Sequence, residues 1–265
     1  MGRKRERSPV RLWRRIDGWL EKAYNKVVGT FTGKAIVKLT SEIIMACLIA
    51  AAVYGATELH NYIRIVSVDN EKLSQIYISV SDEYVDLLFG TPYIEVNEDD
   101  ELVNHFYLLH DSVLRTVSKD NKVVAYFITS TNPKRKIPID TYDDENNMIG
   151  TIKYSNVDFA NPEVVSNITM DGRYVYYYER QGTGRYGMYN SYLYGIAPYG
   201  FVDDRSAELI HLTAWGEDYS EEEYQKARSS VLPNTFGVIA DGYENVISII
   251  PTCDEWNNMF YLLKK

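Results

Sequence analysis

The chain has 265 residues, a formal net charge of −9, two cysteines and 23 tyrosines. Residues 1–38 carry eleven Lys and Arg against three acids, and residues 39–265 carry seventeen against thirty-four. A body this acidic argues against nucleic acid as its ligand. So few cysteines argue against a disulfide-stapled eukaryotic secreted domain and favour a bacterial protein.

An apolar run without charges covers residues 43–57, directly after the basic segment. A helix over residues 39–59 would be about 31 Å long, which matches a hydrocarbon core of about 30 Å. Because Lys and Arg flank the run on one side, the sequence predicts a single span through the lipid bilayer of a bacterial inner membrane. Its N-terminus would be cytoplasmic and its C-terminal part extracytoplasmic. The alternative is a buried core helix of a soluble protein.

The basic cytoplasmic segment, residues 1–38, has apolar side chains at helical spacing between positions 10 and 27. This pattern predicts an amphipathic helix that lies on the membrane. Its interface residues would be Trp13, Trp19, Arg14 and Arg15, because indole rings and arginines suit the headgroup region. The alternative is a flexible tail whose periodicity is accidental.

Small residues repeat every four positions in the predicted span, at Cys47, Ala51 and Gly55. Such a face allows two membrane helices to approach closely, and it predicts homodimerisation through the transmembrane helix. Because alanine is common in membrane helices, ordinary filler is the alternative interpretation.

Beyond the predicted span, the sequence predicts an α+β fold of antiparallel sheet with a few helices. Residues 60–130 are expected to form a helix, or two short ones, followed by a β-meander. The helical pattern covers 70–89, and the strands are predicted at 103–110, 112–118 and 122–129. Residues 131–147 interrupt the pattern with Asp, Asn and Pro and are expected to form a linker or long loop.

Residues 148–265 are expected to form a Tyr/Gly-rich α+β module. Its predicted strands are 148–154, 173–179, 185–194, 207–213, 236–240, 246–250 and 259–263. A capping box from Ser220 to Glu223 predicts a helix that ends near residue 229.

Nine tyrosines lie between residues 174 and 199, interleaved with glycines. Tyrosine joins a flat apolar face to a hydroxyl, which suits contacts with a protein or a cell-envelope glycan. The predicted ligand contacts are Tyr176, Tyr178, Glu179, Tyr189, Tyr192 and Tyr194. A purely structural role is the alternative, because tyrosine also favours strands.

Catalytic and metal-binding motifs such as HExxH, GxSxG and Walker sequences do not occur, so neither a metal site nor a cofactor is expected. The alternative to a binding protein is a tethered envelope glycan hydrolase that uses Glu179 with Asp203 or Asp204. Such an enzyme needs two carboxyl groups about 5 to 10 Å apart. A structural subunit of a membrane complex is the third hypothesis.

Two stretches resemble known families. The Leu-Phe-Gly-Thr-Pro sequence at 88–92, with the meander ending in Val-Val-Ala-Tyr-Phe at 123–127, resembles the helix-plus-sheet module of outer-membrane assembly lipoproteins of the SmpA/OmlA type. The Tyr/Gly block, with 178–179, 187–190 and 195–200, is similar to a group of bacterial single-pass membrane proteins. Because the lipoprotein cysteine is missing, a role in outer-membrane assembly does not carry over, and neither resemblance supplies catalytic residues.

Overall fold

The structure is a computed structural model. It describes residues 22, 31–97, 101–139, 147–157, 163–168, 175–182, 190–197, 204–214 and 220–243. The chain divides into two compact units, Met1–Arg64 and Ile65–Lys265. The predicted interface residues Trp13, Trp19, Arg14 and Arg15 lie outside the described residues.

Helix α2, Phe31–Leu73, contains 43 residues and includes the whole predicted span. It contains no proline, a residue that would remove a backbone hydrogen bond and kink the helix. The large apolar side chains between Ile43 and Tyr54 are more than half exposed. Among the described helices, α2 alone is long and apolar enough to cross a membrane, over Ile43–Leu73.

The helical pattern at residues 70–89 belongs to two elements. Helix α2 ends at Leu73, and the short helix α3, Asp82–Phe89, follows after a turn. Ser81 caps α3, because its side chain accepts a hydrogen bond from the backbone N–H of Tyr84. Gly90 ends the helix with a φ of +84°, a conformation that favours glycine.

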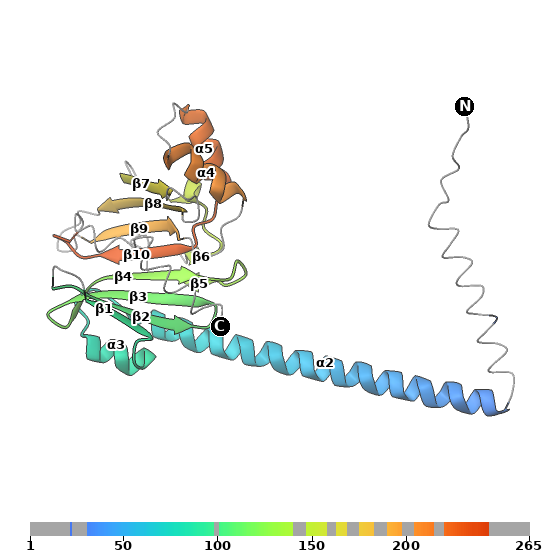
Figure 1. Cartoon of the computed structure of the whole chain (residues 1–265). Coiled ribbons are helices and arrows are strands. Elements are labelled where there is room, and N and C mark those ends of the chain that lie inside the picture. The colour runs from blue at the N-terminus through green and yellow to red at the C-terminus, as the bar shows by residue number, and fades with distance from the viewer. Residues whose placement is uncertain are drawn as a thin grey trace, which may run out of the picture. The chain divides into compact units, whose positions relative to one another are not determined.

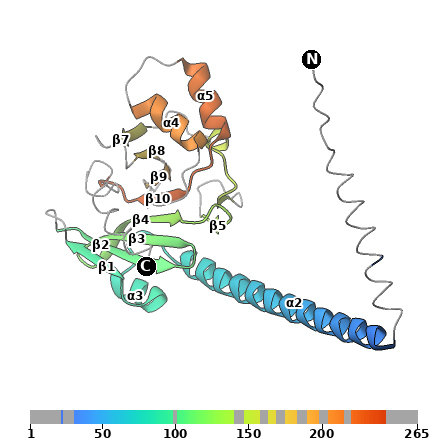
Figure 2. The same ribbon diagram turned by 45° about the vertical axis from the view of Figure 1, so that its right-hand side comes forward.

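Within the described residues, eight strands form one sheet in the order β1-β2-β3-β4-β10-β9-β8-β7 (Figures 1 and 2). All neighbouring strands are antiparallel. The strands are β1 Ile94–Asn97, β2 Val103–Leu109, β3 Ser112–Lys119, β4 Lys122–Ser130, β7 Glu163–Ile168, β8 Val175–Gly182, β9 Ser191–Ile196 and β10 Thr235–Ile239. The sheet therefore consists of two four-stranded halves, joined where β4 pairs with β10.

Two short strands, β5 Ile137–Pro138 and β6 Met148–Ile149, form a separate antiparallel pair. Strand β5 lies within the 131–147 segment that was expected to be a linker or loop. Strand β6 begins at the residue after this segment. Because β4 and β10 pair, strands from before and after this segment belong to the same sheet.

The predicted meander of β2, β3 and β4 is confirmed to within two residues, and so are β10 and the α5 helix, Glu221–Ser230. The strand predicted at 207–213 is wrong, because this stretch lies in helix α4, Asp204–Ala214. Its buried side chains Ser206, Leu209 and Ile210 have helical rather than alternating spacing. The strand predicted at 148–154 is limited to β6, and the 3-10 helix η1, Tyr154–Asn156, follows it.

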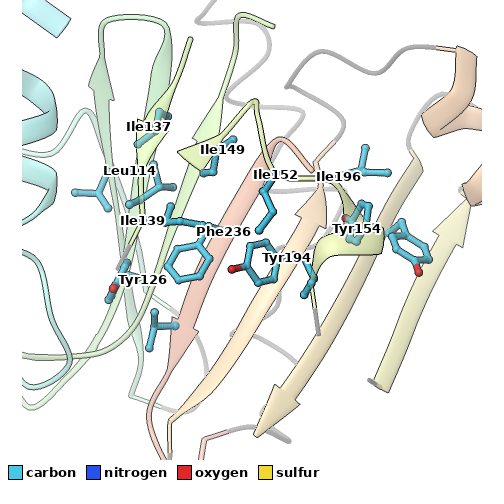
Figure 3. Close-up of a cluster of buried hydrophobic side chains, with 14 of the residues drawn as sticks. Leu114, Tyr126, Ile137, Ile139, Ile149, Ile152, Tyr154, Tyr194, Ile196 and Phe236 are labelled. Carbon is cyan, nitrogen blue, oxygen red and sulfur yellow. The ribbon is translucent and has the colours of Figure 1, made fainter. Parts of the chain in front are cut away.

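Strands β1 and β7 were not predicted, and the strands expected at 246–250 and 259–263 lie outside the described residues. Helix α4 packs on β7 and β8, at the end of the sheet opposite β1 (Figure 1). Figure 3 shows ten labelled buried side chains gathered over one face of the sheet. They come from both halves of the sheet, from β5 and β6 with the residues beside them, and from η1: Leu114, Tyr126, Ile137, Ile139, Ile149, Ile152, Tyr154, Tyr194, Ile196 and Phe236.

Candidate functional site

A pocket of about 120 Å³ lies where the two halves of the sheet meet. Its wall combines the end of β4, the loop that follows β4, the turn after β6, α4 and the segment before β10. The lining residues are Ser130, Asn132, Pro133, Arg135, Ile149, Gly150, Ser206, Leu232, Pro233 and Asn234. All of them belong to the second compact unit.

One wall of the pocket is held by Asn234. Its Nδ2 donates to the carbonyl oxygen of Ala197 at 3.0 Å, and its Oδ1 accepts from the N–H of Ala197 at 2.8 Å. Its carbonyl oxygen accepts from the N–H of Ser130 at 2.8 Å. Asn234 therefore fixes the segment before β10 to the ends of both β4 and β9.

Another wall depends on a close approach between Gly150 and the loop after β4. Gly150 has a φ of +84°, and a Cβ added there would lie 2.7 Å from the carbonyl oxygen of Arg135. Both the conformation and the space require glycine. The turn after β6 can therefore pack directly against the backbone of Arg135.

Arg135 is the charged residue of the pocket wall, and it is almost completely buried, at 1% exposure. Its Nη2 donates to Oδ1 of Asn70 at 2.7 Å, and its Nη1 donates to the carbonyl oxygen of Lys136 at 3.1 Å. Burial of an arginine requires such compensating partners. The guanidinium is thus held in place at the pocket by groups on two segments.

Leu232 and Pro133 give the pocket an apolar rim, and Pro233 is buried in its wall. Leu232 is 42% exposed, whereas Ser130, Ser206 and Asn234 are buried. An apolar opening with a few buried polar groups is typical of binding sites. The volume is below the roughly 300 to 1,000 Å³ of pockets for whole small molecules. It suits a single side chain of a partner.

Glu179, a predicted ligand contact, is instead part of a buried polar network. Arg228 on α5 donates from Nε and Nη2 to the two carboxylate oxygens of Glu179, each at 2.7 Å. The Tyr177 hydroxyl donates to Oε1 of Glu179 at 2.7 Å and lies 2.8 Å from the Tyr224 hydroxyl. The Glu179 side chain has no exposed surface. It joins β8 to α5 and offers no oxygen to a bound substrate.

The electrostatics of this network follow from burial. Burial and the nearby Glu179 charge raise the pKa values of Tyr177 and Tyr154 far above the ordinary value of 10.0. For Arg228, burial alone would lower the pKa, but hydrogen bonding and charge attraction from Glu179 outweigh it and raise the pKa. Tyr177 and Tyr154 therefore stay neutral, and Arg228 stays charged.

The other predicted ligand contacts are also mostly inaccessible. Tyr178 and Tyr194 are buried, and the Tyr178 ring lies against Gly195 on the neighbouring strand. Tyr192 is half-buried and packs near Phe236. Tyr178, Glu179 and Tyr194 therefore present almost no exposed surface in this structure, and a role in ligand binding stays a prediction for them.

Two further predicted contacts are less fully described. The backbone of Tyr176 pairs with that of Asn167 in β7. Tyr189 lies outside the described residues. The same holds for Asp203, half of the predicted hydrolase pair, whereas Asp204 begins α4.

The proposed helix-packing face, Cys47, Ala51 and Gly55, lies in α2 and is exposed. A Cβ added at Gly55 would meet no atom within 4 Å. Among the described residues, no group of three or more His, Cys, Asp or Glu side chains could hold a metal ion.

The sequence did not predict the pocket. Pro133 lies in the 131–147 segment that was expected to be a linker or loop, and Gly150 lies in a stretch that was predicted as a strand. The residues that meet there come from segments far apart in the chain. Their convergence depends on the pairing of β4 with β10, which no local pattern reveals.

No protein-family model matches the chain. No curated protein matches it either. Two solved structures are similar to part of it, each at 12% identity. A cysteine-rich secretory protein from Staphylococcus aureus subsp. aureus Mu50 has a TM-score of 0.32, and an extracellular protein containing a SCP domain from Bacillus anthracis str. Ames has a TM-score of 0.29. Each comparison covers 62% of this chain and 44% of the other, so the chain spans less than half the length of these structures.

Proposed function

We propose that the protein is a single-pass membrane protein that presents an extracytoplasmic α+β domain for binding another protein. The observation that carries the proposal is α2, a helix whose apolar side chains between Ile43 and Tyr54 remain exposed in the folded chain. Exposed apolar surface of this extent is unfavourable in water and favourable in lipid. The lipid bilayer is therefore its natural partner.

The orientation rests on charge. The basic residues before α2 keep the N-terminus in the cytoplasm under the positive-inside rule, so the domain from Ile65 onward is exported. The inner membrane of a bacterium is the proposed location. We also propose that two copies of the transmembrane helix pack together through Cys47, Ala51 and Gly55.

The pocket is the proposed contact site for the partner. Its volume of about 120 Å³ and its apolar rim at Leu232 and Pro133 suit one apolar side chain of a protein better than a sugar ring. The Glu179–Arg228 ion pair counts against the hydrolase alternative, because the carboxylate is fully engaged inside the core.

The anchor is tested by placing two arginines in α2, Leu48→Arg with Val53→Arg. An arginine at the centre of a span costs about 2.5 to 3.5 kcal/mol of insertion free energy, so the variant should be released from membranes by alkaline extraction. The matched control, Ser67→Arg with Glu71→Arg, changes the same helix beyond the predicted span and should stay in the membrane. Equal retention of both variants would contradict the anchor.

Orientation is tested with Leu87→Cys, because this side chain on α3 is 80% exposed. A membrane-impermeant maleimide should label it in intact spheroplasts without lysis. Labelling that requires lysis would place the domain in the cytoplasm.

Partner binding is tested with a photo-crosslinking residue at Leu232 and, as the matched control, at Leu87. A protein adduct should form at Leu232 in cells, should be lost in Ser206→Leu, which fills part of the pocket, and should not form at Leu87. Circular dichroism checks that Ser206→Leu is folded. An adduct that is insensitive to pocket filling would overturn the site, and a glycan adduct would change the ligand class.

A further inference from the structure

The pocket wall is hydrogen-bonded directly to the end of α2. Arg135 lines the pocket and donates from Nη2 to Oδ1 of Asn70, in the last turn of that helix, at 2.7 Å. Both groups belong to the second compact unit. A hydrogen bond from a charged donor is strong enough that a displacement of Arg135 acts on Asn70.

A second connection starts from Asn132, which also lines the pocket. Its Nδ2 donates to Oδ2 of Asp111 at 2.9 Å, and the N–H of Thr131 donates to the carbonyl oxygen of Asp111 at 3.0 Å. The neighbouring residue, His110, donates its backbone N–H to Oδ2 of Asp69 at 3.0 Å. The turn between β2 and β3 therefore links the loop after β4 to α2.

The two connections reach consecutive residues of one helix. Asp69 and Asn70 lie just before Leu73, which is buried in the same core cluster as Ile149 of the pocket wall. The two hydrogen-bonded residues and the buried Leu73 lie in the same two turns of α2. The loop of residues 131–136 cannot shift without either carrying these turns along or breaking hydrogen bonds to them.

We propose that the loop of residues 131–136 transmits occupancy of the pocket to the end of α2. A side chain that enters the pocket moves Arg135 and Asn132, and these residues change the hydrogen bonds at Asn70 and Asp69. Because coupling between two sites is reciprocal, a change in α2 also changes the affinity of the pocket. The inference rests on the proposed binding function, since it couples binding at the pocket to the end of α2.

The test uses the full chain in lipid nanodiscs and a tethered probe in place of the unidentified partner. In a background with Cys47→Ser and Cys253→Ser, Leu232→Cys is modified with benzyl methanethiosulfonate, which places a benzyl group at the pocket. Hydrogen exchange of the amides of residues 66–74 is then measured by mass spectrometry. We expect a change in exchange rate of about fivefold or more, the lower end of ordinary coupling between sites.

Two controls make the result specific. Leu87→Cys carries the same benzyl group on α3, outside the pocket wall, and should leave exchange of residues 66–74 unchanged. In Asp69→Ala with Asn70→Ala, modification at Leu232→Cys should no longer change α2 exchange, although mass spectrometry shows full modification. We call the proposed transmission from the pocket to the end of α2 the relay. An unchanged exchange rate in the chain with native Asp69 and Asn70, or an equal change in the double-alanine chain, would overturn the relay.

The outcomes separate the relay from the binding function. A pocket-dependent adduct at Leu232 with unchanged exchange in α2 would leave the binding function in place and remove the relay. A change in α2 exchange without any adduct in cells would establish the relay and remove the proposed protein partner.

Discussion

The Arg228 side chain on α5 holds both carboxylate oxygens of Glu179 on β8, from Nε and Nη2, at 2.7 Å each. This paired geometry is the strongest form of contact between the two residue types. The two residues are 49 positions apart in sequence, and β9 and α4 lie between them. The ion pair therefore fixes α5 to the half of the sheet that consists of β10, β9, β8 and β7.

Glu179→Ala should strongly destabilise the domain. Removal of one partner leaves the Arg228 charge buried without its carboxylate, which costs about 3 to 5 kcal/mol of folding free energy. The measurement is urea unfolding of the full chain in detergent, with Glu222→Ala, an exposed acid on α5, as the matched control. A double variant, Glu179→Leu with Arg228→Met, should recover much of the loss, and failure of that recovery would contradict the explanation.

Gly195→Ala should destabilise the sheet. Gly195 pairs across β8 and β9 with Tyr178, and an added Cβ would overlap the Tyr178 ring. Overpacking of this kind costs about 1 to 3 kcal/mol. The thermal midpoint of the full chain measures it, and Gly55→Ala, which meets no atom within 4 Å, serves as the control. Equal midpoints for the two variants would show that the ring moves aside without cost.

The α5 capping box should make stability depend on pH through Glu223. Hydrogen bonds from the backbone and the hydroxyl of Ser220 lower the pKa of Glu223 below its ordinary value of 4.5. Since the folded-state pKa is the lower one, the stabilisation is present above pH 4.5 and is lost as the pH falls through the folded-state pKa. The difference in urea midpoint between the native chain and Glu223→Gln should therefore shrink on acidification. A difference that stays constant between neutral and strongly acidic pH would argue against this assignment.

Alkaline titration should reveal a class of tyrosines that ionise only with unfolding. Burial raises the pKa values of Tyr177, Tyr154 and Tyr107, so their neutral forms stabilise the fold below the ordinary pKa of 10.0, and this contribution is lost as the pH rises above it. Absorbance at the phenolate band should show how many tyrosines ionise only on unfolding. Tyr177→Phe should lower this number by one. Tyr77→Phe, at an exposed position, is the control and should leave it unchanged.

The sequence predicted the parts of the fold that local patterns control. The capping box at Ser220, the end of the helical pattern at residue 89 and the strands of the first meander depend on neighbours in sequence, and the structure contains all of them. Helix α4 was mistaken for a strand, because its apolar residues Leu209, Ile210 and Leu212 form a short run that periodicity alone does not assign to helix or strand.

The site was less predictable, for a physical reason. A tyrosine-rich strand with one open face would expose alternate rings, but Tyr177 and Tyr178, which point to opposite faces of β8, are both buried. Tyr178 and Glu179 are buried by partners distant in sequence, Gly195 and Arg228. The elements packed on each face of the sheet decide exposure here, and a single sequence contains no direct signal for that packing.

The joint between β4 and β10 has a consequence for how the chain folds. The hydroxyls of Thr129 on β4 and Thr235 on β10 lie 2.9 Å apart across a separation of 106 residues. Contacts this distant in sequence form slowly, and during synthesis the first meander is complete long before β10 exists. Until then β4 is an unpaired edge, open to pairing with strands of other chains. The arrival of β10 thus ends an interval in which the nascent chain is vulnerable to aggregation.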